Sequence, residues 1–226
     1  MTSSDYKLFK AEGMREAIAM VIAATGSSGR EPQQVADNLV LANLKGHDSH
    51  GIGMVPRYVD SFLEGGLKVN QQPLSKIDAG PLLGLDGQAG FGQSIGEAAT
   101  DMAIARAKEH GVCVMGLGHA HHLGRIGHWA EQAVSQDLIS IHFVNVLSRP
   151  TVAPWGGAAG RFGTNPCCIG IPMRNEAPVI LDYATSMVAQ GKMRVAHNKG
   201  EEVRSGMLID QHGHPTTNPS VVVVEP

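Results

Sequence analysis

The sequence predicts an α/β protein, with a helical N-terminal part followed by a part in which strands and helices alternate. Two observations support this fold class. Apolar residues recur at helical spacing through most of the first 65 residues. Beyond them, short apolar runs bounded by glycine alternate with further helical patterns. We therefore expect a helical part over residues 1–66 and an α/β part over residues 67–226.

The helical part is expected to contain three helices, over residues 6–25, 31–45 and 55–64. Glycines follow the first and the third of them and end the pattern. Between the second and third helices, residues 46–51 read Gly-His-Asp-Ser-His-Gly and break the periodicity. A histidine-bearing loop is therefore expected between two helices.

The second part is expected to begin with turn-rich, β-like chain and then to alternate strands with helices. Helices are expected over residues 93–109, with Gly111 ending the segment, and over residues 124–136. A further helical stretch is expected to open at residues 182–186. The expected strands cover residues 82–85, 112–117, 138–146, 167–171 and 179–181, followed by a hairpin-like end with strands over 207–210 and 221–224.

Composition excludes several classes of protein. A hydrophobic content of 42% and a net charge of −3 are typical of a folded chain and not of a disordered one. No run of 18 apolar residues is present, and the polar N-terminus lacks the apolar core of a signal peptide, so no membrane association is expected. Without a basic excess, no nucleic-acid binding is expected. Three cysteines without a C-x-x-C motif favour a reducing, cytoplasmic location.

The first candidate site is the run Asp48-Ser49-His50-Gly51 in the loop between two helices. Histidine titrates near neutral pH, so a loop histidine beside a hydroxyl group can act as a general acid or base. The alternative is a helix cap with a bystander histidine, because aspartate and serine are common N-cap residues. The four residues alone leave both interpretations open.

The second candidate site is the segment 116–127, Gly-Leu-Gly-His-Ala-His-His-Leu-Gly-Arg-Ile-Gly, between an expected strand and an expected helix. Such a turn can bind an anion at the helix N-terminus, and Arg125 adds a guanidinium for phosphate. A Rossmann fingerprint is rejected because the third glycine position is His121. The local histidines raise the question of a metal site, but no cysteine or carboxylate accompanies them, so no metal is expected.

The third candidate site is the run Asp182-Tyr183-Ala184-Thr185-Ser186 after an apolar strand. A carboxylate at a strand end can accept two hydrogen bonds from a ribose diol. The alternative is a run of helix-capping residues, since Asp, Thr and Ser all cap helices.

Together these segments resemble the type-2 malate/L-lactate dehydrogenases. The resemblance rests on five motifs in order along essentially the whole chain. They are Gly46-His47-Asp48-Ser49-His50-Gly51-Ile52-Gly53-Met54-Val55-Pro56, His121-His122-Leu123-Gly124-Arg125-Ile126-Gly127, Ala153-Pro154-Trp155-Gly156-Gly157, Gly163-Thr164-Asn165-Pro166 and Asp182-Tyr183-Ala184-Thr185-Ser186. This resemblance implies a non-Rossmann α/β fold with a mixed-sheet cofactor-binding part. It also implies hydride transfer between a small 2-hydroxy or 2-oxo acid and NAD, with NADP as the other possible cofactor, in a homodimer.

The resemblance also implies roles for individual residues. His50 matches an acid/base histidine that Ser49 orients, and His122 matches a second histidine that some members use as proton acceptor. The choice between the two histidines stays open. The residues implied for cofactor binding are Gly124, Arg125 and Ile126 at the pyrophosphate, and Ile180, Leu181, Asp182, Tyr183 and Ala184 on the ribose side.

Two departures from the family pattern affect the expected function. Many members carry an arginine where this chain has Met54, and the nearest arginine here is Arg57. A larger or more apolar 2-oxo acid, such as an aryl-pyruvate, therefore becomes a candidate substrate beside malate and lactate. Members also continue beyond residue 226, so we expect a chain shortened at its C-terminus. The alternatives are an inactive cofactor-binding or oligomerising remnant, and a histidine-rich metal protein.

Overall fold

The computed structural model describes residues 8–147 and 149–224. The chain forms two compact units, Met1–Trp129 and Ala130–Pro226, and each is described by itself below. The division at residues 66/67 that the sequence favours stays a prediction about domain organisation. Residues 6–7 of the first expected helix and residues 225–226 of the expected C-terminal hairpin lie outside the described residues.

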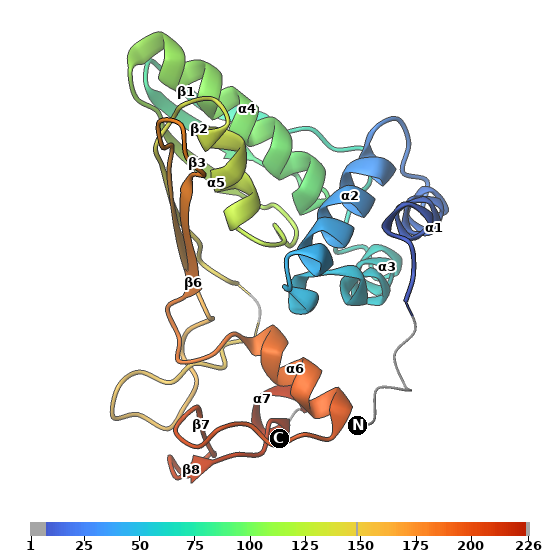
Figure 1. Cartoon of the computed structure of the whole chain (residues 1–226), viewed down its shortest axis with the longest axis vertical. Helices are drawn as coiled ribbons and strands as arrows, with labels where there is room; N and C mark the ends of the chain where they lie inside the picture. The colour runs from blue at the N-terminus through green and yellow to red at the C-terminus, as the bar shows by residue number, and fades with distance from the viewer. Residues whose placement is uncertain (1–7, 148, 225–226) are drawn as a thin grey trace. The chain divides into compact units, whose positions relative to one another are not determined.

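The three expected N-terminal helices are present. They are α1 (Ala11–Ala23), α2 (Glu31–Leu44) and α3 (Val55–Leu63), and they cluster in the first unit (Figure 1). A proline in the first turn starts both α2 and α3, where its missing N–H is not needed by the helix. The core between the helices consists of Ile18, Ile22, Val35, Ala36, Leu39, Val40, Met54, Tyr58, Leu67 and Phe91.

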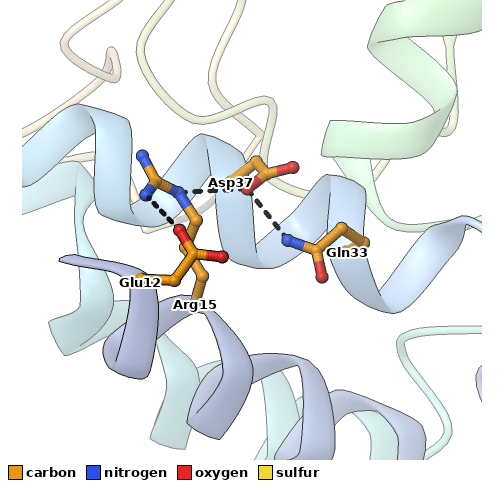
Figure 2. Close-up of polar contacts among 4 residues, drawn as sticks. All are labelled: Glu12, Arg15, Gln33 and Asp37. Carbon is orange, nitrogen blue, oxygen red and sulfur yellow. Dashed lines mark hydrogen bonds and ion pairs between the residues drawn. The ribbon is translucent and has the colours of Figure 1, made fainter.

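Polar contacts tie α1 to α2 at the edge of this core. Figure 2 shows Arg15 of α1 between two carboxylates, with Nε 3.1 Å from Asp37 Oδ1 and Nη1 3.4 Å from Glu12 Oε2. Gln33 Nε2 donates to the same Asp37 oxygen over 3.0 Å. The carboxylates are largely exposed, so these pairs fix the register of the two helices but contribute little to stability.

A buried carboxylate joins α2 to a fourth helix, α4 (Gly92–His110). Glu31 is only 6% exposed, and its oxygens accept hydrogen bonds from Ser27 Oγ (2.6 Å), Ser94 Oγ (3.1 Å) and the Asn70 N–H (2.8 Å). A buried charge requires such partners to offset the loss of hydration. Glu31 therefore fixes the start of α4 against α2.

A three-stranded mixed sheet packs against α4. Strand β1 (Leu74–Ala79) runs antiparallel to β2 (Leu82–Asp86), and β2 runs parallel to β3 (Val114–Gly118). Helix α4 makes the crossover between the two parallel strands, and Gly111 ends it with φ at 79°, as expected. Leu83, Leu85 and Ala99 form the core between sheet and helix.

Helix α5 (Gly127–Val134) begins three residues later than the sequence predicts. Gly124 has φ at 70°, in the left-handed region, so it cannot be the first residue of a right-handed helix. The helix forms only after this turn. The histidine-rich residues 119–123 form a loop, as expected, and the loop continues through residues 124–126.

The second unit contains an antiparallel sheet in the order β4 (Ser140–Phe143), β5 (Pro166–Ile171) and β6 (Val179–Ala184). Gly170 in β5 lies where an added Cβ would be 3.0–3.1 Å from side-chain atoms of Val134, Ala130 and Ser140. One face of the sheet therefore packs closely on α5, and Cys168 is fully buried there. The other face exposes apolar side chains, which are Ile141, Phe143, Ile171, Val179, Leu181 and Tyr183.

The helical stretch expected to open at residues 182–186 is wrong. Residues 182–184 continue β6 and do not open a helix, because Asp182 and Tyr183 pair with Cys168 and Cys167 of β5. The next helix, α6 (Gln190–Lys199), starts later. The side chains of this run could cap a helix, but the neighbouring strand β5 already supplies hydrogen-bond partners for the backbone N–H and C=O groups, and this favours the strand.

The expected C-terminal hairpin is present in shorter form. Strands β7 (Leu208–Ile209) and β8 (Pro215–Thr216) flank the turn at residues 210–214. The expected strand at 221–224 is wrong, because residues 220–223 form the short helix α7 (Ser220–Val223). Pro219 starts this turn, and its carbonyl accepts the N–H of Val222. No described helix is long and apolar enough to cross a membrane.

Candidate active site

The loop between α2 and α3 holds the first candidate histidine in a defined position. Two short 3₁₀ turns, η1 (Asp48–His50) and η2 (Ile52–Met54), fill this loop. Asn43 at the end of α2 donates to Asp48 Oδ1 over 2.6 Å and accepts the Ile52 N–H over 2.8 Å. Between these two bonds, a side chain at Gly51 would overlap the Asn43 amide, so glycine is required there. The amide of Asn43 thus fixes the loop from both sides of His50.

The loop between β3 and α5 is held by backbone hydrogen bonds to the residues that precede α4. The Ala89 N–H donates to the His119 carbonyl over 2.6 Å, and the His121 N–H donates to the Gly90 carbonyl over 3.0 Å. Trp129 Nε1 closes the other side by donating to the Leu123 carbonyl over 3.0 Å. The main chain of this loop is therefore held on both sides of His121 and His122.

The fold brings His50 and His122 together from these two loops. Their rings stack with centroids 5.5 Å apart and planes 13° apart. Ser49 Oγ lies 3.0 Å from His50 Nδ1, and Ser49 itself is buried. Histidine is a common general acid and base in enzymes, and the fold places two of these side chains, each half-buried, side by side.

Tyr58 of α3 supports His122 from the interior of the first unit. Its hydroxyl lies 2.7 Å from His122 Nδ1 and accepts a hydrogen bond from Gln93 Nε2 over 2.8 Å. Tyr58 is fully buried and its ring also packs edge-on against Phe91, with centroids 5.9 Å apart. This buried chain fixes the orientation of the His122 ring.

His121 faces a different set of groups. Its Nε2 lies 3.0 Å from Ser61 Oγ, and its ring meets Tyr58 edge-on at 5.5 Å. Burial, and secondly the positive charge of Arg57, lower the pKa of His121 below its usual value of 6.5. His121 is therefore held neutral at neutral pH, and among the described residues its Nδ1 is buried without a hydrogen-bond partner.

The residues expected at a cofactor pyrophosphate precede α5. Gly124 turns the chain, and the Arg125 and Ile126 carbonyls accept the N–H groups of His128 and Trp129 in the first turn. The Arg125 side chain is only 6% exposed, so it lies inside the first unit and is not presented on its surface. The N–H groups of His128 and Trp129 therefore already have carbonyl partners, and the helix dipole is what favours an anion at this end of α5.

The residues expected on the ribose side lie along β6 in the second unit. Ile180, Asp182 and Ala184 are half-buried, whereas Leu181 and Tyr183 alternate with them and are exposed. Successive strand residues point to opposite faces, so one ligand cannot contact all five side chains on one face. A hydrogen bond to Cys167 is the main cause that raises the pKa of Tyr183.

Histidine clustering does not produce a metal-binding arrangement in the described part of the chain. No three or more His, Cys, Asp or Glu side chains converge there as a metal site requires. His119 instead lies 3.4 Å from Asp86 Oδ1 at the surface.

Comparison with known proteins identifies the family. The model of the malate/L-lactate dehydrogenase family matches residues 9–225. The chain belongs to the malate/L-lactate dehydrogenase family. It is 46% identical to hydroxycarboxylate dehydrogenase B of Escherichia coli K12 over 218 residues, which is 96% of this chain and 60% of that protein. It is 39% identical to L-lactate dehydrogenase of Cupriavidus necator over 209 residues, which is 91% of this chain and 59% of that protein.

The same family appears among solved structures. Sulfolactate dehydrogenase from Methanocaldococcus jannaschii matches with a TM-score of 0.85 and 33% identity, covering 96% of this chain and 62% of that one. The predicted α/β, non-Rossmann fold of the malate/L-lactate dehydrogenases is thus confirmed. The chain spans about 60% of the length of these relatives.

Sequence reasoning missed the groups that support the two histidines in this malate/L-lactate dehydrogenase homologue. Asn43 falls on the line of Val35 and Leu39 along α2, and a polar residue on an apolar line is a signal that could have found it. Tyr58 is one of only three tyrosines, and a buried tyrosine hydroxyl needs a partner. Gln93 gives no such local signal, because only the packing of α4 shows that it is buried.

Replacing Arg57 by alanine is expected to raise the pKa of His121, because the variant removes a positive charge that opposes protonation. The lowered pKa of His121 also makes the stability of the fold depend on pH. Above pH about 6.5 the imidazole is neutral in both the folded and the unfolded chain, and the stability is at its full value. As the pH falls below this value, the unfolded chain binds the proton more readily than the folded one, so the free energy of unfolding decreases. An NMR titration of the His121 ring measures the change.

Arg57→Lys is the control for this prediction, because it keeps the charge and is expected to leave the pKa of His121 near that of the unsubstituted protein. A pKa that falls or stays constant in Arg57→Ala would contradict the electrostatic coupling. Arg57 is exposed, so the substitution itself should not disturb folding.

Proposed function

We propose that this chain acts in the interconversion of a 2-hydroxycarboxylate and a 2-oxocarboxylate by hydride transfer with a nicotinamide cofactor. The stacked pair His50 and His122, each supported by its own hydroxyl group, is the observation that carries the proposal. The named relatives, which are hydroxycarboxylate and L-lactate dehydrogenases, support the reaction class. An alcohol gives up a proton and a hydride on oxidation, and a neutral imidazole is suited to take the proton.

The residues before α5 fit a dinucleotide cofactor through their backbone. The turn at Gly124 leads directly into the first turn of α5, where partial positive charge favours the pyrophosphate. Asp182, half-buried on β6, is a carboxylate suited to accept hydrogen bonds from a ribose diol. When bound, the cofactor supplies the hydride chemistry, and the protein residues hold it and move the proton. We propose NAD, with NADP as the alternative.

The substrate is proposed to bind near the exposed guanidinium of Arg57. Met54 is only 4% exposed and belongs to the apolar core, so its side chain cannot bind a substrate carboxylate. Arg57 lies one helical turn before Ser61, the residue that contacts His121, and can pair with the carboxylate of a 2-oxo acid. We therefore propose small 2-oxo acids as the class and include aryl-pyruvates. A homodimer and a cytoplasmic location complete the proposal.

The test is a titration of the purified chain with NADH and NADPH, followed by a panel of 2-oxo acids with and without an aromatic group. Cofactor fluorescence reports binding, and loss of absorbance of the reduced cofactor reports turnover. We expect binding and turnover with at least one 2-oxo acid. Binding without turnover would favour a cofactor-binding remnant, and absence of both would contradict the proposal.

A further inference from the structure

The antiparallel sheet of the second unit has one face that lies against α5 and one face that is open to solvent. The register of β4, β5 and β6 places three rows of residues on the open face, which are Ile141 with Ile169 and Leu181, Phe143 with Cys167 and Tyr183, and Ile171 with Val179. Directly paired residues of neighbouring strands point to the same side of a sheet, so the side chains of each row lie together. None of these residues carries a charged side chain. The open face is therefore apolar across all three strands.

The polar side chains of these strands lie on the opposite face. Ser140, His142 and Asp182 alternate with the apolar residues along β4 and β6, and Gly170 on the same face packs closely on α5. An antiparallel sheet with one solvated face usually has polar side chains on that face and apolar ones on the covered face. The alternation is reversed here, so the open face is not adapted to water and requires a covering layer.

The open face is large enough to hold two copies of the chain together. Its six large exposed side chains, which are Ile141, Phe143, Ile171, Val179, Leu181 and Tyr183, are between 38% and 82% exposed. A large apolar side chain presents on the order of 150–200 Å² when fully in water, so the face offers roughly 500–600 Å². Two such faces in contact would bury on the order of 1,100 Å², which reaches the area of about 1,000 Å² that a specific interface needs.

The chemistry of the open face fits an identical face. Because it carries no charge, two copies meet without like-charge repulsion, and no unpaired charge is buried between them. Two sheets pack face to face at about 10 Å when the side chains of both inner faces interdigitate. Closed two-fold pairing, in which the same patch of both copies meets, is the commonest assembly of identical chains.

We propose that two copies of this chain pair through the open faces of their β4–β5–β6 sheets, sheet against sheet. The inference rests on the homodimer of the proposed function and deepens it by naming the surface that forms it. Leu181 and Tyr183 then contact the partner copy. Asp182 lies on the opposite face of β6, so this pairing does not cover the carboxylate proposed for the cofactor ribose.

Sedimentation velocity of the purified chain over a range of concentrations tests the inference. We expect the unsubstituted chain to sediment with twice the mass of one copy, and Phe143→Lys and Val179→Lys to sediment as single chains. The two positions lie in different rows and on the two outer strands of the sheet. A lysine at either would bury an unpaired charge in the pairing, which should raise the dissociation constant by about a hundredfold or more.

Met20→Lys is the matched control. Met20 is a 70% exposed apolar residue of α1 in the first unit, so the same substitution there should keep the double mass. Phe143 and Val179 are 82% and 50% exposed, so lysine fits both positions in the folded single chain. Circular dichroism checks the folding of each variant, and if one of the two does not fold, the other decides the result.

Two results would overturn the inference. Single chains at every concentration would show that the open face does not pair with itself and is left for a different polypeptide. A double mass that persists in both folded lysine variants would show that the copies pair through another surface, and the proposed homodimer would still hold. The measurement uses neither cofactor nor substrate, so failure of the proposed hydride transfer and failure of this inference are distinguishable.

Discussion

Gly92→Ala is expected to lower the free energy of unfolding of the first unit by about 3 kcal/mol, the upper part of the range for overpacking. An added Cβ at Gly92 would overlap the carbonyl group of His122 and approach the His121 carbonyl oxygen to 2.7 Å. These are main-chain atoms, so no side-chain rotation relieves the overlap. The loop between β3 and α5 must therefore move, and the rings of His121 and His122 move with it.

Trp129 provides the measurement for this variant. It is 4% exposed, whereas Trp155 is fully exposed, and the chain has two tryptophans, so the fluorescence change on urea unfolding reports mainly on the first unit. Gly13→Ala is the control with the opposite sign: nothing lies within 4 Å of its Cβ position in α1, and it should stabilise by about 0.5–1 kcal/mol. Equal stability of the two variants would contradict the close approach at Gly92.

Replacing the acid/base histidine by alanine is expected to lower kcat by about 10²–10⁴-fold, the usual contribution of general acid–base catalysis. His50→Ala and His122→Ala identify which of the two histidines has this role. The histidine that transfers the proton should give the large loss, and the other a smaller one from the lost ring stacking. Steady-state kinetics with the 2-oxo acid that the panel identifies, over pH 5–9, measures both.

His110→Ala is the matched control, because His110 belongs to the same unit but lies at the end of α4, where it faces Glu109 at 3.7 Å. It should keep full turnover. If His50→Ala and His122→Ala both keep full turnover as well, the proton transfer does not depend on this pair. The kcat loss must also be compared with the unfolding curve of each variant, since His122 contacts buried Tyr58.

The local sequence was sufficient to predict where the two histidines lie along the chain. His50 follows a break in helical periodicity, and His122 follows an apolar strand, so both were expected in loops. The supporting groups could not be predicted in the same way. Tyr58 belongs to α3 and Gln93 to α4, and their contact depends on how those helices pack.

The wrong predictions have a common physical cause. At Asp182 and at Val221–Val224, the secondary structure that the residue types favour differs from the one that the surrounding chain stabilises. Pairing with β5 keeps Asp182 in a strand, although the run that follows contains helix-capping side chains. The four valines favour a strand, yet Pro219 and the bond from Val222 N–H start a helical turn among the described residues.

Sequence alone determined the order of the helices in the first unit, the two histidine loops and the family, because periodicity, glycine punctuation and motif order are local properties of the chain. Only the tertiary structure decided that His50 stacks on His122, that Asn43 holds one loop, and that Gln93 and Tyr58 form a buried chain to the imidazole. The contacts of His50 with His122 and of Gln93 with Tyr58 join residues far apart in sequence, and even the short-range Asn43 contact depends on how the loop folds back on α2. A buried polar group must find a partner, and packing alone determines which partner is within reach.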